Sequence, residues 1–150
     1  MQVLGAGAFY KSKIASVVII PGNENEGCLK KIPTSTFWNC NCLEVVSLPD
    51  SIKSIELTAF EACYVLHTIN IPANIKKIGN DDAAKSAGDY RGLGSVFAEC
   101  EELYEIKIPE SVQSIEFIED NWGKGNFKGC GKLPLATRQK LKDLGYKGKF

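Results

Sequence analysis

Six cysteines and one histidine are the side chains of this 150-residue sequence that most readily do chemistry. Cys40 and Cys42 form a close pair, but no second pair with zinc spacing accompanies them. Four of the cysteines share a context, since each follows a phenylalanine by three residues: Cys40, Cys63, Cys100 and Cys130. Buried cysteine behaves as a small hydrophobe. We therefore predict a row of buried free thiols, with disulfides between neighbouring members as the alternative.

Catalytic and cofactor-binding patterns are missing from the sequence. No nucleophile is paired with the single histidine, His67, by a recognisable motif. The glycine-rich stretch 88–94 does not follow the strand-to-helix context that a phosphate loop requires. Asp81, Asp82 and Asp89 lack the alternating spacing of an EF-hand. We therefore expect no enzyme activity, no cofactor and no metal ion.

The cysteines belong to a repeated pattern that must position them. From Phe60 to Pro72 it reads Phe-x-x-Cys-x-x-Leu-x-x-Ile-x-Ile-Pro, and isoleucines follow the proline at +3 and +6. Strong copies begin at Phe37 and Phe97, and a truncated copy begins at Phe127. A weaker copy begins at Phe9, with Ser12, Ala15 and Val18 at the cysteine, leucine and first isoleucine positions.

The repeat length predicts the architecture. Phe37 and Phe60 are 23 residues apart, and repeats of about 20–29 residues are typical of leucine-rich solenoids. We predict one solenoid domain of about five repeats, near 4–36, 37–59, 60–96 and 97–126, with a partial repeat and helical cap at 127–150. In the cap, a helix over 134–144 would bury Leu141 and Leu144 and end at Gly145.

Each copy contributes a short strand to a parallel sheet on the concave side. Side chains alternate along a strand, and solenoids usually bind through their concave surface. We predict that these sheet positions point outward and bind a partner: Val17, Ile19, Val45, Ser47, Thr68, Asn70, Glu105 and Lys107, flanked by His67 and Tyr104. The alternative for any single position is a solvated sheet surface.

Two insertions supply further candidate binding residues. They occupy about 80–96 and 119–126 at equal places in the repeat, so we expect them to lie on one flank. Tyr90, Arg91 and Trp122 are the candidates there, with Trp122 folded back onto the flank as the alternative.

Composition and the chain start limit the partners. The 18 basic and 18 acidic residues balance, so we expect neither nucleic-acid binding nor a basic membrane patch. No apolar run approaches the roughly 18 residues of a membrane-spanning helix. The chain opens in mid-repeat without a signal peptide or polar cap. We therefore expect a fragment of a longer array, whose N-terminal edge could contact a further repeat or another copy.

The pattern from Phe97 to Ile115 resembles that of the BspA-like (Treponema-type) leucine-rich repeat family, and the resemblance covers about residues 4–133. It implies an arc-shaped solenoid in a non-enzymatic bacterial protein, often secreted or at the cell surface. It also implies a protein ligand, from the host matrix or a bacterial surface. A glycan ligand is also considered, and the alternative role is a structural spacer or self-associating segment.

Overall fold

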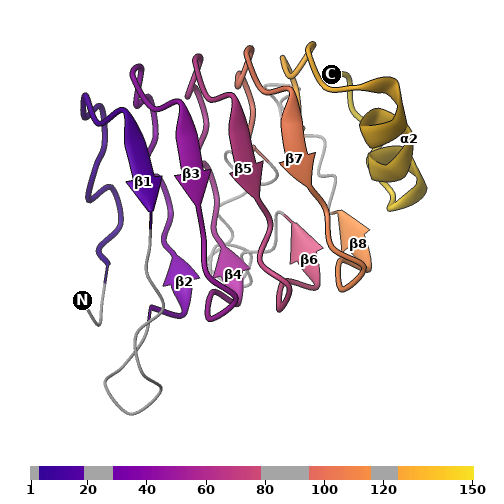
Figure 1. Ribbon diagram of the computed structural model, residues 1–150, viewed down its shortest axis with the longest axis horizontal. Helices are drawn as coiled ribbons and strands as arrows, with labels where there is room; N and C mark the ends of the chain where they lie inside the picture. The colour runs from indigo at the N-terminus through magenta and orange to yellow at the C-terminus, as the bar shows by residue number, and fades with distance from the viewer. Residues whose placement is uncertain (1–3, 19–28, 79–94, 116–124) are drawn as a thin grey trace, which may run out of the picture.

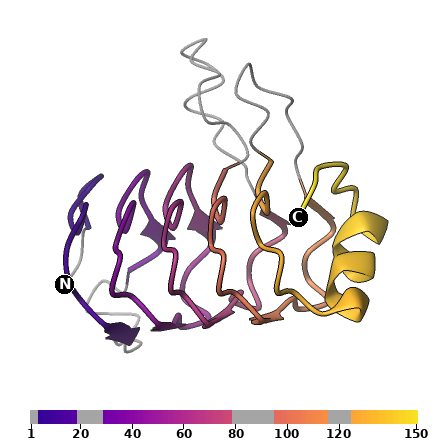
Figure 2. The same cartoon turned by 90° about the horizontal axis from the view of Figure 1, so that it is seen from above.

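A computed structural model describes residues 4–18, 29–78, 95–115 and 125–150. The chain winds as a solenoid whose turns lie side by side (Figure 1). The larger sheet is parallel, with strand order β1 (Ser16–Val18), β3 (Val45–Ser47), β5 (Thr68–Asn70) and β7 (Glu105–Lys107). Figure 2 shows the turns following one another in a row, with this sheet along one side. The predicted leucine-rich solenoid is confirmed.

A second set of short strands completes the turns. β2 (Lys31–Ile32) pairs with β4 (Ser54–Ile55), and β6 (Lys77–Ile78) pairs with β8 (Ser114–Ile115), both in parallel. Prolines stand between the first and second strand of a turn, at Pro49 and Pro72. Because proline has no backbone N–H to donate, it helps to end the first strand where the chain must change direction.

A column of phenylalanine rings forms the centre of the core. Consecutive rings of Phe9, Phe37, Phe60, Phe97 and Phe127 stack with centroids 5.3, 5.1, 5.7 and 5.5 Å apart. The residue two places after each ring has a positive φ, between 53° and 84°: Lys11, Asn39, Ala62, Glu99 and Gly129. A left-handed backbone costs a non-glycine residue roughly 1–2 kcal/mol. The stacked core must offset that cost at four of the five turns.

The first turn departs from the predicted frame by one residue. Its start is in frame, because the Phe9 ring stacks on Phe37 and the Ser12 and Cys40 side chains, 28 residues apart, are in contact. Its strand is out of frame, because Val17 pairs with Val46 and these two residues are 29 apart in the sequence rather than 28. The first turn therefore has one residue fewer between its phenylalanine and its strand.

This shift corrects two sequence-based predictions. Ile14 packs against the core, whereas Ala15, which the repeat pattern places at the leucine position, is exposed. Val17 was predicted to point outward with Ile19 and Val45, but it pairs with a buried residue and packs against the core. Ile19 lies outside the described residues. Of these three residues, the structure describes only Val45 as an exposed side chain, at 43%.

The C-terminal cap is confirmed. Helix α2 (Leu135–Asp143) buries Leu141, and Leu144 packs partly against the core. Gly145 stops the helix with φ +104°. Salt bridges from Lys132 to Glu102 and from Lys140 to Glu110 (3.1 Å) join the cap region to the preceding turn. In the part of the chain that is described, no helix is both long and apolar enough to cross a membrane.

Tyr146 is a cap residue that the repeat pattern did not predict. Its ring meets Phe127 edge-on at 5.5 Å, so it closes the phenylalanine column. Its hydroxyl accepts a hydrogen bond from the Phe127 N–H (3.3 Å) and donates one to the Lys149 carbonyl (2.8 Å). The Tyr146 hydroxyl thus accepts the hydrogen bond of the Phe127 N–H, which at the earlier phenylalanines is accepted by a carbonyl of the next turn. Burial raises the pKa of Tyr146 to about 12.

Candidate functional site

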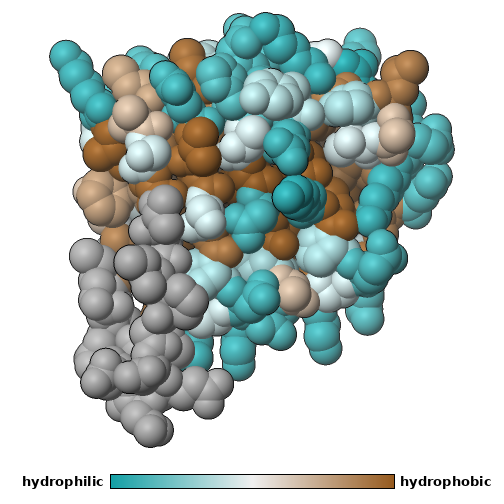
Figure 3. Space-filling view, in the orientation of Figure 1, coloured by the Kyte–Doolittle hydropathy of each residue, from teal (hydrophilic) through white to brown (hydrophobic). Residues whose placement is uncertain are grey.

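The outward side of β3, β5 and β7 carries a shallow hollow of about 250 Å³. Its exposed or partly exposed lining residues, here called the sheet face, are Val45, Ser47, Thr68, Asn70, Glu105 and Lys107. Figure 3 shows this side of the molecule, where hydrophobic and hydrophilic side chains are intermixed. The hollow is smaller than typical small-molecule pockets of about 300–1,000 Å³. It suits a few side chains of a larger partner.

The chemistry of the sheet face changes from strand to strand. β3 presents Val45 and Ser47, one apolar and one hydroxyl side chain. On β7, Glu105 and Lys107 are both exposed and carry opposite charges. The register sets Glu105 beside Thr68 of β5, which is partly buried. A ligand lying across the strands would therefore meet an apolar side, a hydroxyl-bearing centre and a charged side.

Asn70 differs from its neighbours because its amide is already used within the sheet. Its Oδ1 accepts a hydrogen bond from the Leu48 N–H (2.8 Å), and its Nδ2 donates to the Leu48 carbonyl (2.7 Å). The side chain thus takes the place of a backbone partner at the end of β3. Asn70 lines the hollow, but its clamp on Leu48 is a structural role that the sequence did not suggest.

An aromatic pair borders the sheet face. The rings of His67 and Tyr104 lie 5.7 Å apart and are tilted by 33°. The backbone continues the ladder here, since the Tyr104 N–H donates to the His67 carbonyl (3.2 Å). The Tyr104 side chain is 50% exposed. An exposed tyrosine on a rigid backbone is a side chain that protein interfaces favour.

The four repeat cysteines are buried, free and hydrogen-bonded in one manner. The thiol of each donates to the carbonyl of the phenylalanine one turn earlier, with Sγ–O distances of 3.0, 3.1, 3.2 and 3.2 Å for Cys40, Cys63, Cys100 and Cys130. Burial raises the pKa of all four, to about 12 for Cys63 and Cys130. Since the thiolate is the nucleophile and metal ligand, these thiols are inert at neutral pH.

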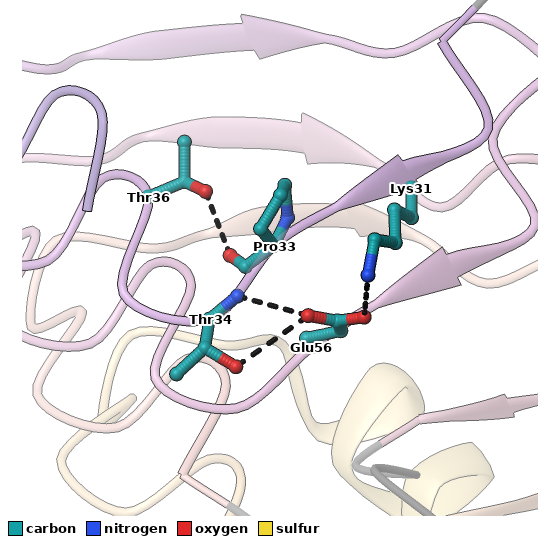
Figure 4. A network of polar contacts seen from close by, with 5 residues as sticks. All are labelled: Lys31, Pro33, Thr34, Thr36 and Glu56. Atoms are coloured by element: carbon teal, nitrogen blue, oxygen red, sulfur yellow. Dashed lines mark hydrogen bonds and ion pairs between the residues drawn. The ribbon is translucent and has the colours of Figure 1, made fainter. Parts of the chain in front are cut away.

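Glu56 joins two neighbouring turns at their second strands (Figure 4). One carboxylate oxygen meets Lys31 Nζ at 2.9 Å, and the other accepts from the Thr34 N–H at 3.1 Å. Nearby, the Thr36 hydroxyl donates to the Pro33 carbonyl at 2.7 Å. This network ties the backbone between β2 and Phe37 to the next turn.

Some of the remaining candidate residues lie within the described part of the chain and others do not. Tyr90, Arg91 and Trp122 lie outside the described residues, so the flank of insertions stays a prediction. Over the ranges that are described, no group of three or more His, Cys, Asp or Glu side chains could hold a metal ion. An aromatic pair that we did not predict, Tyr10 and Trp38, has ring centroids 5.0 Å apart and is partly exposed. The sequence contained a signal for this pair, because an aromatic residue directly follows each of the first two repeat phenylalanines, Phe9 and Phe37.

The stack of short parallel strands, with one phenylalanine per turn, defines a leucine-rich repeat protein. The chain belongs to the BspA-type leucine-rich repeat family, whose model matches six copies over residues 1–86 and 93–138. Membership in that family supports a repeat-module role of the kind used in protein interaction. No curated protein matches the chain significantly.

Solved structures agree with this assignment. A leucine-rich repeat protein of T. pallidum is 30% identical with a TM-score of 0.62, covering 81% of this chain and 47% of its own. One from Bacteroides ovatus is 25% identical with a TM-score of 0.54, covering 97% and 44%. A leucine-rich cell surface protein of Faecalibacterium prausnitzii (23%, TM-score 0.51, covering 93% and 37%) shows the fold alone. This chain spans less than half the length of each.

Proposed function

We propose that this chain is a non-enzymatic protein-interaction module that binds a protein ligand through its sheet face, with His67 and Tyr104 at the border. The observation that carries the proposal is the hollow over β3, β5 and β7, where exposed side chains differ from strand to strand. The four repeat thiols, at Cys40, Cys63, Cys100 and Cys130, are buried in the core, and burial raises the pKa of each. A rigid sheet with varied outward side chains is suited to recognition rather than reaction.

We also propose the setting. One structural neighbour, from Faecalibacterium prausnitzii, is a leucine-rich cell surface protein, which supports the proposal of a ligand met outside the cell, in the host matrix or on another bacterium. A glycan ligand fits the sheet face less well, because most of the polar groups of the sheet face lie on β5 and β7, whereas β3 also presents the apolar Val45. The insertions at 80–96 and 119–126 are proposed to enlarge the interface.

The size of the sheet face limits affinity. The three strands of the sheet face are about 4.8 Å apart and span roughly 10 Å, so the face offers at most a few hundred Å², less than the roughly 800 Å² per partner of a standard interface. Binding by this chain alone should therefore be weak. Avidity across further repeats, or contacts from the insertions, would be needed for tight binding.

Self-association is a second candidate that one observation favours. Phe9 is only partly buried although the other four phenylalanines of the column are fully buried. Ile14, Val17 and Leu29 are also only partly buried at this end. Sedimentation at increasing protein concentration tests it, since end-to-end association predicts a rising mass and the spacer role alone predicts a constant one.

The main test is binding to immobilised extracellular-matrix and bacterial surface proteins. The Glu105→Lys/Lys107→Glu variant reverses the charges of the sheet face without changing the net charge. We expect it to lose binding that the wild-type chain shows. The matched control is Glu101→Lys/Lys147→Glu, which exchanges exposed charges elsewhere and should bind normally. Binding that both variants retain would refute the sheet face as the binding site.

A further inference from the structure

The second strands of the solenoid gather lysine side chains on a surface separate from the sheet face. We call it the lysine ridge: Lys30, Lys31, Lys53, Lys76 and Lys77. All five are exposed. β2, β4 and β6, which carry or adjoin them, lie below the four-stranded sheet in Figure 1, and Figure 3 shows hydrophilic side chains projecting along that edge.

Backbone pairing places these lysines in rows. The Lys53 N–H donates to the Lys30 carbonyl at 2.7 Å, so the two occupy neighbouring positions on adjacent turns. Lys76 follows its proline by four residues, as Lys53 does, and β4 contacts β6. Neighbouring strands are about 4.8 Å apart, so this row of three spans roughly 10 Å. Lys31 and Lys77 extend the ridge on the next position along the strands.

Folding does not account for this arrangement. Like charges on neighbouring strand positions are destabilising. Glu56 offsets the charge of Lys31, but among the described residues no carboxylate pairs with Lys53, Lys76 or Lys77. The fold tolerates uncharged residues at the same positions, because β8 has Gln113 and Ser114 where β6 has Lys76 and Lys77.

We propose that the lysine ridge binds a linear acidic polysaccharide whose carboxylates repeat along its length. A row of ammonium groups, one per turn, complements a polymer with a regular series of anions. The ridge offers ammonium groups alone, without the arginine forks or aromatic rings with which proteins read and stack nucleic-acid bases. This favours a polyanion recognised by charge over a nucleic acid. The ridge and the sheet face lie on different strands, so this site is independent of the proposed protein interaction.

The test compares three immobilised probes: polygalacturonate, its uncharged methyl ester and double-stranded DNA. The ridge variant is Lys53→Gln/Lys76→Gln/Lys77→Ser, which uses the residue types that β8 carries naturally. The control variant, Lys142→Gln/Lys147→Gln/Lys149→Gln, removes the same charge from exposed positions of the cap region. Thermal unfolding of each variant verifies that both remain folded.

We expect the wild-type chain to bind polygalacturonate in a salt-dependent manner and not its methyl ester. The ridge variant should bind about tenfold more weakly or worse, and its slope of log affinity against log salt should fall by about two, at roughly 0.7 per lost charge. The cap variant should bind like wild type. The proposal is overturned if polygalacturonate is not bound, if the methyl ester binds equally, if the cap variant weakens as much, or if DNA binds more tightly.

Discussion

The interior of each turn and the sheet face outside it differ in how far they repeat. Inside, phenylalanine stacks on phenylalanine at every turn. From the second turn onward, a cysteine thiol donates a hydrogen bond to the phenylalanine carbonyl of the preceding turn. Outside, the paired positions change from Val45 to Thr68 to Glu105. The fold needs the same residue types at every turn, because each turn must match its neighbour. Apart from Asn70, whose amide bonds to the Leu48 backbone, the varied outer positions are under no such constraint, so they are free to serve recognition.

The largest expected effect comes from breaking the repeated interior. Phe60→Ala removes a fully buried ring that stacks between two others, at 5.1 and 5.7 Å. Replacing a buried phenylalanine by alanine costs about 3–5 kcal/mol. Denaturant unfolding should show this loss in the free energy of unfolding. A loss below about 1 kcal/mol would mean that the ring column does not hold the turns together.

Asn70→Ala tests an outer position that performs an interior task. Its loss leaves the buried Leu48 without partners for its N–H and carbonyl, and an unsatisfied buried polar group costs about 1–3 kcal/mol. Asn74→Ala is the control, because that exposed side chain bonds to a single carbonyl, that of Asp50. Unfolding measurements should show the larger loss for Asn70→Ala. Equal losses would refute the clamp.

The interior thiols predict a dependence of stability on alkaline pH. Burial raises the pKa of Cys63 and Cys130 from 9.0 to about 12, so between pH 9 and 12 the unfolded chain loses protons that the folded chain keeps. The free energy of unfolding should therefore fall as pH rises through this window, by at most about 1.4 kcal/mol per pH unit for each thiol.

Denaturant unfolding at a series of alkaline pH values measures this slope. Tyr146, whose pKa is also raised to about 12, contributes in the same direction. Cys63→Ala/Cys130→Ala should keep the tyrosine contribution and lose that of the two thiols. An unchanged slope in this variant would contradict the assignment of buried, protonated thiols.

The repeated interior was predictable from sequence because its periodicity constrains every copy. The first strand was not, because Val17 to Ile20 are all apolar, and a run without alternation does not specify which residue points inward. Tyr146 lies beyond the repeats, so no frame position identified it. The Asn70 clamp depends on an amide conformation, and an outward asparagine looks the same in sequence whether it bonds to solvent or to a neighbouring strand.

The central claim is that the sheet face, apart from Asn70, carries binding and not folding, and Thr68→Arg tests it most directly. Thr68 lines the hollow between β3 and β7 and is not part of the core. We expect the free energy of unfolding to change by no more than about 0.5 kcal/mol, as for substitutions outside a core. Binding to whichever surface or matrix protein the wild-type chain recognises should be lost, because the larger cation fills the hollow. A variant that unfolds more easily by several kcal/mol, or one that binds as well as wild type, would contradict the account.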